Sequence, residues 1–232
     1  MSLATYKKKR SFKETPEPKG RKNTSSAKGL KFVIQKHDAT SLHYDFRLEM
    51  EGVLKSWAVP KGPSINPDDK RLAMMVEDHP FDYRDFEGTI PEGNYGAGTV
   101  MVWDEGIYDP LDHEKETVSE QQKILLQELK KGDLKFVLHG KKIKGAFALV
   151  KMKGRGENAW LLIKKHDDES SKADITKKDK SVKSNRTLNQ IAEAGGTKVK
   201  KRTLVTKKKS TPLLLEEVTR RPVKKNSRKK KV

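Results

Sequence analysis

One stretch of the sequence places reactive side chains at the spacing of a β-strand. The stretch reads His43-Tyr44-Asp45-Phe46-Arg47-Leu48-Glu49-Met50. Alternate side chains of an extended strand share a face, so His43, Asp45 and Arg47 point one way while the apolar residues between them point toward a core. A neutral imidazole beside a carboxylate can ligate a divalent transition metal, and an Arg one step further along can bind phosphate oxygens.

A third ligand is available at the end of the preceding strand. His37 lies just before a turn through Asp38–Leu42, and that turn can bring His37 back over His43. Two His and one Asp leave open coordination positions for water or substrate, as catalytic metal sites do. The alternative is an ordinary strand with solvated or ion-paired polar residues, and the spacing alone does not decide between the two interpretations.

A second polar cluster follows a later strand and reads Glu77-Asp78-His79-Pro80-Phe81-Asp82-Tyr83. His79 and Tyr83 fall at a Pro-containing turn, and loop residues held on a rigid sheet often carry function. A turn with a packed Tyr and a solvated His is the plainer alternative. The glycines within residues 87–98 lack the Lys-Ser/Thr ending of a P-loop, so they indicate turns and bulges. The remaining histidines have no ligand-like neighbours: His113, His139 and His166.

The distribution of turn residues and β-branched or aromatic residues predicts a mainly β fold. Strands are expected at Lys31–Lys36, Leu42–Met50, Val53–Val59, Arg71–Val76, Gly98–Trp103, Leu134–Leu138, Lys144–Met152 and Ala159–Lys164. Many short strands with close turns are typical of a compact antiparallel β-barrel. Apolar residues at helical spacing over Thr117–Lys131, with Gly132 after them, predict one short amphipathic helix packed on that barrel.

Charge divides the chain into three segments. The net charge is +19, yet residues 29–167 contain slightly more acidic than basic residues. We therefore expect a basic arm over 1–28 that orders only where it meets the core or a ligand, a barrel domain over 29–167, and a lysine-rich connector and tail over 168–232. The tail is expected to be largely disordered apart from a short helix at Arg186–Ala194. Such polycations attract polyanions, so nucleic acid is the first partner to consider and an anionic membrane surface is the second.

Absent features narrow the class of protein. The chain has no cysteine, which excludes disulfides, thiolate zinc sites and a cysteine nucleophile. It contains neither a signal peptide nor an apolar stretch of the ~18–20 residues that span a bilayer. We therefore expect a soluble cytoplasmic protein with no membrane partner.

Several dense motifs occur in the order seen in one known family. They are Phe32–Arg47, Trp57–Pro63, Glu77–Tyr83 and Phe86–Pro91, followed by Gly93, Tyr95-Gly96 and Gly98. Over roughly Tyr6 to Lys165 the chain resembles the 3′-phosphoesterase domain of bacterial ATP-dependent DNA ligase D. The resemblance implies an antiparallel β-barrel enzyme of DNA end repair that depends on manganese or a similar divalent metal. Such domains remove a terminal ribonucleoside from a primer 3′ end and then hydrolyse the remaining 3′-phosphate to a 3′-hydroxyl.

The resemblance also implies a role for individual residues. The family's metal ligands fall on His37, His43 and Asp45, its other active-site groups on Arg47, His79 and Tyr83, and its substrate contacts on Arg10, Glu17, Gln35, Lys61 and Arg71. In this scheme Arg47 holds nonbridging phosphate oxygens, and His79 protonates a leaving oxygen or donates a hydrogen bond to the phosphoryl group. Tyr83 orients the phosphate or His79. Ser11 replaces an acidic residue of the family's arm, which puts one arm contact in question.

Residues 174–192 resemble the connector that follows this module in multidomain ligase D proteins. No Lys-x-Asp-Gly nucleotidyl-transfer signature is present, so we expect a stand-alone enzyme whose basic tail tethers it to DNA. Its expected partners are DNA 3′ ends, primer-template junctions and a ligase, polymerase or Ku of an end-joining system. Its expected location is the bacterial or archaeal cytoplasm, at the nucleoid.

Two other classes compete with this interpretation. A non-catalytic barrel that binds single-stranded nucleic acid would expose several aromatic side chains on one sheet face. Aromatic residues make up only 6% of the chain. Tyr44 and Phe46 are predicted on the strand face opposite His43, Asp45, Arg47 and Glu49, which form the polar row. A structural metal protein is disfavoured because three ligands with open positions suit catalysis better than a closed site.

Overall fold

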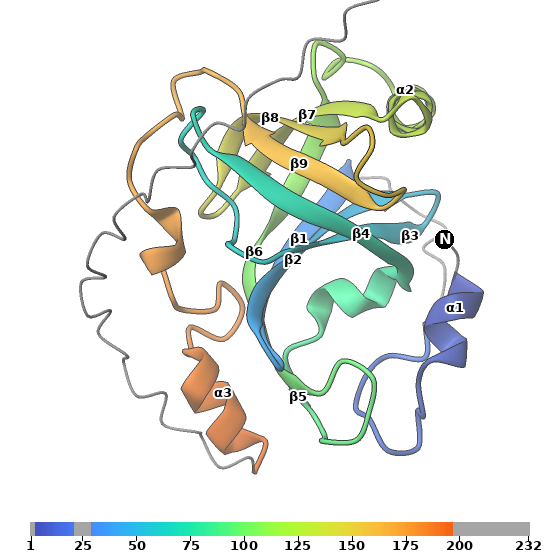
Figure 1. Cartoon of the computed structure of the whole chain (residues 1–232), viewed down its shortest axis with the longest axis vertical. Coiled ribbons are helices and arrows are strands. Elements are labelled where there is room, and N and C mark those ends of the chain that lie inside the picture. Colours follow the sequence, from blue (N-terminus) through green and yellow to red (C-terminus); the bar gives the residue numbers. More distant parts are fainter. Residues whose placement is uncertain (1–2, 21–28, 197–232) are drawn as a thin grey trace, which may run out of the picture. The chain divides into compact units, whose positions relative to one another are not determined.

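A nine-stranded antiparallel sheet closes into a barrel in the computed structural model, which describes residues 3–20 and 29–196 (Figure 1). The strands are β1 (Leu30–Asp38), β2 (Leu42–Met50), β3 (Val53–Val59), β4 (Lys70–Pro80), β5 (Gly88–Ile90), β6 (Gly98–Pro110), β7 (Asp133–Gly140), β8 (Lys144–Lys151) and β9 (Ala159–Lys164). β1 pairs with both β2 and β6, which closes the barrel, and the short strand β5 lies beyond β6 at the edge. The predicted mainly β barrel is confirmed.

The barrel interior is apolar because β2 alternates as predicted. Its inward residues Tyr44, Phe46 and Leu48 join the main hydrophobic core with Trp57 and Phe136. The outward residues of β2 are also buried: Asp45, Arg47 and Glu49 are each less than a tenth exposed. The polar row is therefore not solvated, and other parts of the chain cover this outer face of the barrel.

The predicted amphipathic helix is α2 (Val118–Lys131). A capping box between Thr117 and Glu120 starts it, and Gly132 ends it in the left-handed conformation at φ 79°. Leu125 is buried in the core, and the helix packs mainly on β7. An added Cβ at Gly98 would collide with the backbone of Asp38. Gly93 and Gly96 lie in the turn between β5 and β6, as predicted for the glycines of residues 87–98, whereas Gly88 and Gly98 lie in paired strands and not in turns or bulges.

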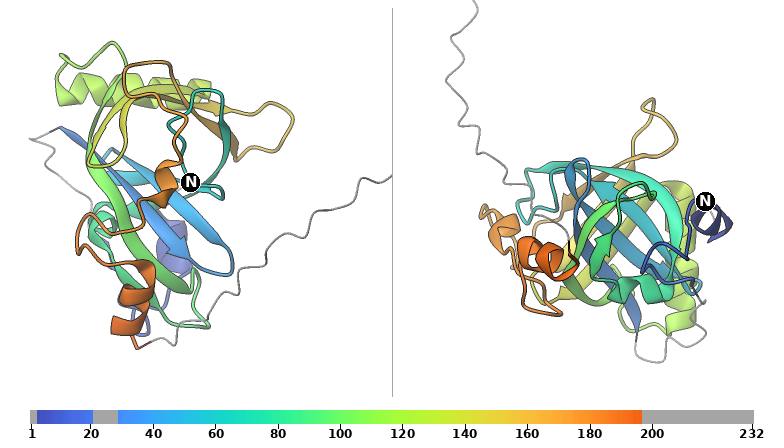
Figure 2. Two further views of the ribbon diagram at one scale, coloured as in Figure 1. Left: turned by 90° about the vertical axis from the view of Figure 1, so that its left-hand side faces the viewer. Right: turned by 90° about the horizontal axis from the view of Figure 1, so that it is seen from below.

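The N-terminal arm covers the outer face of the barrel. Its residues 3–20 are ordered, and they include the short helix α1 (Leu3–Lys8), which contacts β4 (Figures 1 and 2). Tyr6 is completely buried in a second hydrophobic cluster with Val33, Leu54 and Tyr83. Tyr83 itself lies in the 3-10 helix η1 (Phe81–Asp85). Residues 3–20 are thus ordered where the arm meets the barrel, in agreement with the expectation of an arm that orders at the core, and residues 21–28 lie outside the described part.

The connector after the barrel is more ordered than expected. It holds the 3-10 helix η2 (Ile175–Lys177) and the helix α3 (Leu188–Ala194), the helix predicted at Arg186–Ala194. Ile175 and Ile191 are buried in the barrel core cluster. Main-chain contacts fix the segment further, since the Trp103 Nε1–H donates to the Lys178 carbonyl at 2.6 Å. Extensive disorder is thus wrong for residues 168–196, whereas the basic runs Lys207–Lys209 and Arg228–Lys231 lie outside the described residues.

The division of the chain at residues 28 and 167 stays a prediction. Among the described residues, no helix is long and apolar enough to cross a membrane.

Candidate metal and phosphate site

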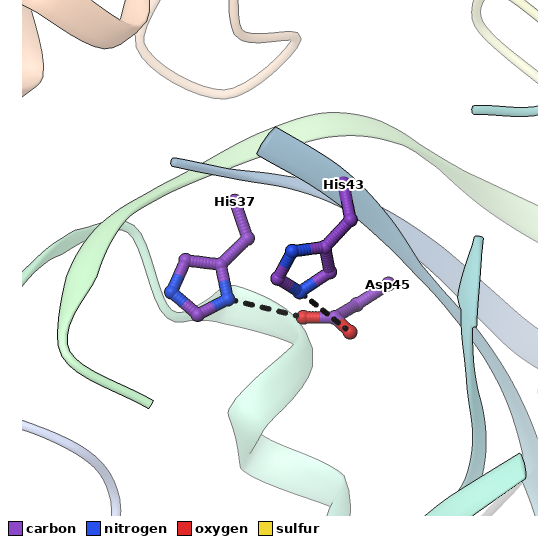
Figure 3. A group of neighbouring side chains, drawn as sticks. All are labelled: His37, His43 and Asp45. Carbon is purple, nitrogen blue, oxygen red and sulfur yellow. Dashed lines mark ion pairs between the residues drawn. The ribbon is translucent and has the colours of Figure 1, made fainter. Parts of the chain in front are cut away.

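The pairing of β1 with β2 brings the three predicted metal ligands together. His37 lies directly opposite His43 in the sheet, and Gln35 lies opposite Asp45. The two carboxylate oxygens of Asp45 approach one ring each: Oδ2 lies 3.6 Å from His37 Nδ1, and Oδ1 lies 3.7 Å from His43 Nε2 (Figure 3). These distances exceed those of ordinary hydrogen bonds. They suit ligand atoms that surround one ion at ~2.0–2.2 Å each.

The hydrogen bonding and charge of these residues also fit a metal. The Nδ1–H of His43 donates to the Ser41 carbonyl at 2.9 Å, so Nε2 is the ring nitrogen that faces Asp45. Burial alone would raise the pKa of Asp45, but Arg47 and the two imidazoles lower it below its usual value. A deprotonated carboxylate and an unprotonated imidazole nitrogen are the forms that bind a cation.

Arg47 is held in place on three sides. Its Nη2 donates to Asp45 Oδ2 at 3.1 Å, its Nη1 to Ser56 Oγ at 2.8 Å, and its Nε to Gln35 Oε1 at 2.8 Å. The side-chain amide of Gln35 in turn donates to the Tyr83 and Phe86 carbonyls at 3.0 and 2.9 Å. A guanidinium has five N–H groups, so Arg47 retains donors for a ligand. Gln35, predicted to contact substrate, lies behind Arg47 and positions it.

The arm delivers Arg10 to the opposite side of the site. Its Nη2 lies 3.2 Å from His79 Nε2, and its Nη1 lies 3.3 Å from Glu77 Oε1. Because Arg only donates, His79 Nε2 accepts, and the proton of the neutral ring sits on Nδ1 and is donated to the Glu77 carbonyl at 2.9 Å. Burial lowers the pKa of His79 well below 6.5, and the charges of Arg47 and Arg10 lower it further.

Two predicted residues support Arg10 and His79 from behind. Glu17 Oε1 accepts hydrogen bonds from Arg10 Nε at 2.8 Å and from the Tyr83 hydroxyl at 3.0 Å. The Tyr83 ring meets the His79 ring edge-on, with centroids 4.8 Å apart. Because the Tyr83 hydroxyl is engaged with Glu17, it is the ring of Tyr83 that faces His79.

These groups surround a cavity of about 210 Å³. It is lined by Arg10, His37, Ala39, His43, Asp45, Arg47, Ala58, Val76, Glu77, His79, Tyr83, Ile90, Tyr95 and Gly96. This volume is below the ~300–1,000 Å³ of sites for drug-sized ligands. A metal ion with a terminal phosphate is a ligand of suitable size.

Not every predicted residue lies at the cavity. Glu17 and Gln35 lie behind it, and neither Lys61 nor Arg71 lines it. Lys61 is exposed after β3, and the Nη2 of Arg71 donates to Asp69 Oδ2 at 2.8 Å. The roles of all the predicted site residues stay predictions.

Sequence reasoning assigned no role to Tyr6 or Ser56. Tyr6 packs edge-on against His79 at 5.1 Å, and the Arg10 guanidinium lies 3.9 Å from the centre of its ring. Tyr6 is isolated among lysines in the sequence, so only the fold reveals its place. For Ser56, the alternation of β3 beside β2 offered a signal, because Ser56 pairs with Arg47 in the sheet.

Comparison with known proteins identifies the family. The profile of the DNA ligase D 3′-phosphoesterase domain matches residues 35–151, which run from within β1 to the end of β8. The chain belongs to this family. The resemblance drawn from the motifs is thus confirmed.

The curated relatives of this chain are much longer proteins. A multifunctional non-homologous end joining protein LigD of Pseudomonas aeruginosa is 50% identical over 192 residues, covering 80% of this chain and 22% of that protein. The LigD of Mycolicibacterium smegmatis is 40% identical over 170 residues, covering 73% and 21%. The LigD of Mycobacterium tuberculosis is 41% identical over 159 residues, covering 68% and 19%. The chain spans about a fifth of the length of these curated relatives.

Proposed function

We propose that this 3′-phosphoesterase chain is a manganese-dependent hydrolase that heals DNA 3′ ends. It removes a 3′-terminal ribonucleoside to leave a 3′-phosphate, and then removes the phosphate to leave a 3′-hydroxyl. The observation that carries the proposal is the position of Asp45. The Asp45 carboxylate faces His37 and His43 and also accepts a hydrogen bond from Arg47. A site for a metal ion therefore lies next to a guanidinium that can bind phosphate.

In the first step water attacks phosphorus, the bond from phosphorus to the 5′-oxygen of the terminal nucleoside breaks, and that oxygen takes up a proton. In the second step the leaving oxygen is the 3′-oxygen of the primer. His37, His43 and Asp45 would hold a divalent ion, which would offset phosphate charge and lower the pKa of a water molecule. Mixed imidazole and carboxylate donors suit manganese and related transition metals.

Arg47 binds the nonbridging oxygens in both steps. Its hydrogen bonds to Gln35, Ser56 and Asp45 fix the guanidinium plane before substrate arrives. A donor that is already oriented stabilises developing charge without reorganisation.

His79 acts on the leaving oxygen once the phosphate has entered. In the free protein its ring is neutral, because burial disfavours the charged imidazole and lowers the pKa of His79, and the charges of Arg47 and Arg10 lower it further. An incoming phosphate offsets both cations and so favours protonation of Nε2. The protonated ring then protonates the leaving oxygen or donates a hydrogen bond to the phosphoryl group, as the sequence predicts.

The competing binding-module interpretation has less support. The aromatic residues of β2 are buried inside the barrel, where Tyr44 is 4% and Phe46 is 1% exposed. They offer no stacking platform for single strands. The relatives' names refer to non-homologous end joining, which supports DNA ends as substrates and a ligase, polymerase or Ku as partners. The proposed location is the bacterial or archaeal cytoplasm, at the nucleoid.

The test is incubation of the purified chain with a labelled primer-template that ends in one ribonucleotide, with and without Mn²⁺. The proposal expects a product shortened by one nucleoside with a 3′-phosphate, followed by a 3′-hydroxyl product, both only with the metal. An unshortened primer in the presence of Mn²⁺ would contradict it.

A further inference from the structure

One aromatic side chain at the rim of the cavity has no place in the chemistry described so far. Tyr95 lines the cavity and is 48% exposed. The large apolar residues that the structure shows exposed within 3–20 and 29–196 are Leu72, Met74, Tyr95 and Ile107. Of these four residues Tyr95 is aromatic, and it lines the cavity.

The lining of the cavity combines polar and apolar groups. Its polar residues are Arg10, His37, His43, Asp45, Arg47, Glu77, His79 and Tyr83. Ala39, Ala58, Val76, Ile90 and Gly96 also line it and carry no charged or polar side chain. A phosphate needs only the polar residues. The apolar part of the lining and the exposed Tyr95 ring can therefore contact another part of the ligand that carries the phosphate.

The arm holds the Tyr95 ring in a fixed place. Lys9 Nζ donates to the Tyr95 hydroxyl at 3.1 Å and lies 4.5 Å from the ring centre. Lys9 also pairs with Glu77 at 3.1 Å, and the Arg10 guanidinium lies 5.4 Å from the ring centre. A ring fixed before binding loses little rotational freedom when a flat ligand stacks on it.

We propose that Tyr95 is a stacking platform for the departing 3′-terminal nucleoside, an inference that rests on the proposed function. Every nucleobase has a π-face, so such a platform binds a terminal nucleoside without regard to its base. The platform serves only the first step, because the nucleoside has left before the 3′-phosphate is hydrolysed. Tyr95 thereby favours ends that carry an extra nucleoside over ends that carry phosphate alone.

The test compares two substrates that share one primer-template. The first ends in a ribonucleotide and the second in a 3′-phosphate. Tyr95→Ala is expected to lower kcat/KM for the first by roughly 5- to 100-fold, mainly through KM, and to leave the second unchanged. Tyr95→Phe keeps the ring but loses the hydrogen bond from Lys9, so it is expected to lie much closer to wild type than Tyr95→Ala does. Ile107→Ala, an exposed apolar residue of β6 that does not line the cavity, is the matched control.

A binding measurement separates this inference from the proposed function. A fluorescent adenine analogue at the 3′ terminus is expected to be quenched on binding by wild type and by Tyr95→Phe, and less by Tyr95→Ala. Equal losses on both substrates, or equal quenching by wild type and Tyr95→Ala, would overturn the inference. Wild-type protein that quenches through Tyr95 but releases no product would contradict the proposed function and leave the platform standing.

Discussion

Arg10 Nη2 in the N-terminal arm lies 3.2 Å from His79 Nε2 on β4, although 69 positions separate the two residues in the chain. The same guanidinium contacts Glu17 and Glu77, so the arm is part of the wall of the phosphate site. An arm that carries only charge would not need such contacts.

Arg10→Ala is expected to lower the saturated rate by roughly 10²-fold, because a positioned cation beside the phosphoryl group is lost. It also leaves Glu17 without its cation, and a buried carboxylate that loses its partner costs about 3–5 kcal/mol of stability. Steady-state kinetics and denaturant unfolding measure the two effects. Lys13→Ala, at an exposed position of the same arm, is the control. An unchanged saturated rate for a folded Arg10→Ala would place the arm outside the chemistry.

Arg47→Ala and His79→Ala are each expected to lower the rate by roughly 10²–10⁴-fold. Arg47→Lys keeps the charge but cannot reproduce the fork that donates to Gln35, Ser56 and Asp45, so it is expected to remain impaired. Single-turnover rates and DNA affinity, measured separately, check the assignment. Near-normal turnover with weakened binding would show that these residues only anchor phosphate.

Truncation after residue 196 and truncation after residue 167 are expected to differ. The shorter protein loses Ile175 and Ile191 from the core, and each buried Ile contributes about 1.5–3 kcal/mol, so its free energy of unfolding falls. The longer protein loses only residues 197–232, which contain fifteen Lys or Arg and two acidic residues. For this longer protein, the slope of log DNA affinity against log salt concentration should become less steep by about 0.7–0.9 per lost phosphate contact. Its saturated turnover should be retained. An unchanged salt slope would mean that the barrel and connector carry the DNA-binding charge.

Lys142 is expected to make the free energy of unfolding depend on pH. Burial lowers its pKa to about 8, while Asp104 opposes the shift and Lys36 and Lys178 add to it. Between pH 8 and the ordinary Lys pKa near 10.4, the unfolded chain binds more protons at this site. The free energy of unfolding contributed by this site therefore rises with pH across that window.

Denaturant unfolding of wild type and Lys142→Met from pH 7.5 to 10.5 tests this account of Lys142. Met keeps an apolar stem against Trp103, beside which Lys142 Nζ lies 4.6 Å from the ring centre. Relative to the variant, wild type should gain stability as pH rises. A difference between the two proteins that does not change with pH would contradict the shift.

Local periodicity predicted the parts of this structure that depend on neighbouring residues. The alternation of β2 placed Asp45 and Arg47 on one face and Phe46 on the other, and the helical spacing before Gly132 located α2. The three-residue strand β5 was missed because it is too short to show alternation. His37 and His43 face each other because a tight turn joins the paired strands β1 and β2. The sequence indicates such a turn between the two residues.

The covering of the outer face could not be predicted in this way. Tyr6 precedes a run of basic residues and Ile175 lies in a lysine-rich stretch, and composition gave no sign that either side chain is buried. Ile191 lies in the predicted short helix, but its spacing did not show which surface that helix packs on. The burial of these residues depends on surfaces that β3, β4, β6 and η1 create together. Such long-range contacts also bury the polar row of β2, which alternation alone leaves at the surface.

The central claim is that His37, His43 and Asp45 form one divalent-metal site, and calorimetric titration of the chain with Mn²⁺ tests it most directly. Asp45→Asn is the decisive variant, because it keeps the shape of the side chain and removes the charge that both imidazoles face. Asp112→Asn removes an acidic group that does not line the cavity and is the control. Wild type and the control are expected to bind one ion per chain, and Asp45→Asn is expected to lose that binding. Wild-type protein that binds no Mn²⁺, or binds it as well with Asn at position 45, would contradict the account.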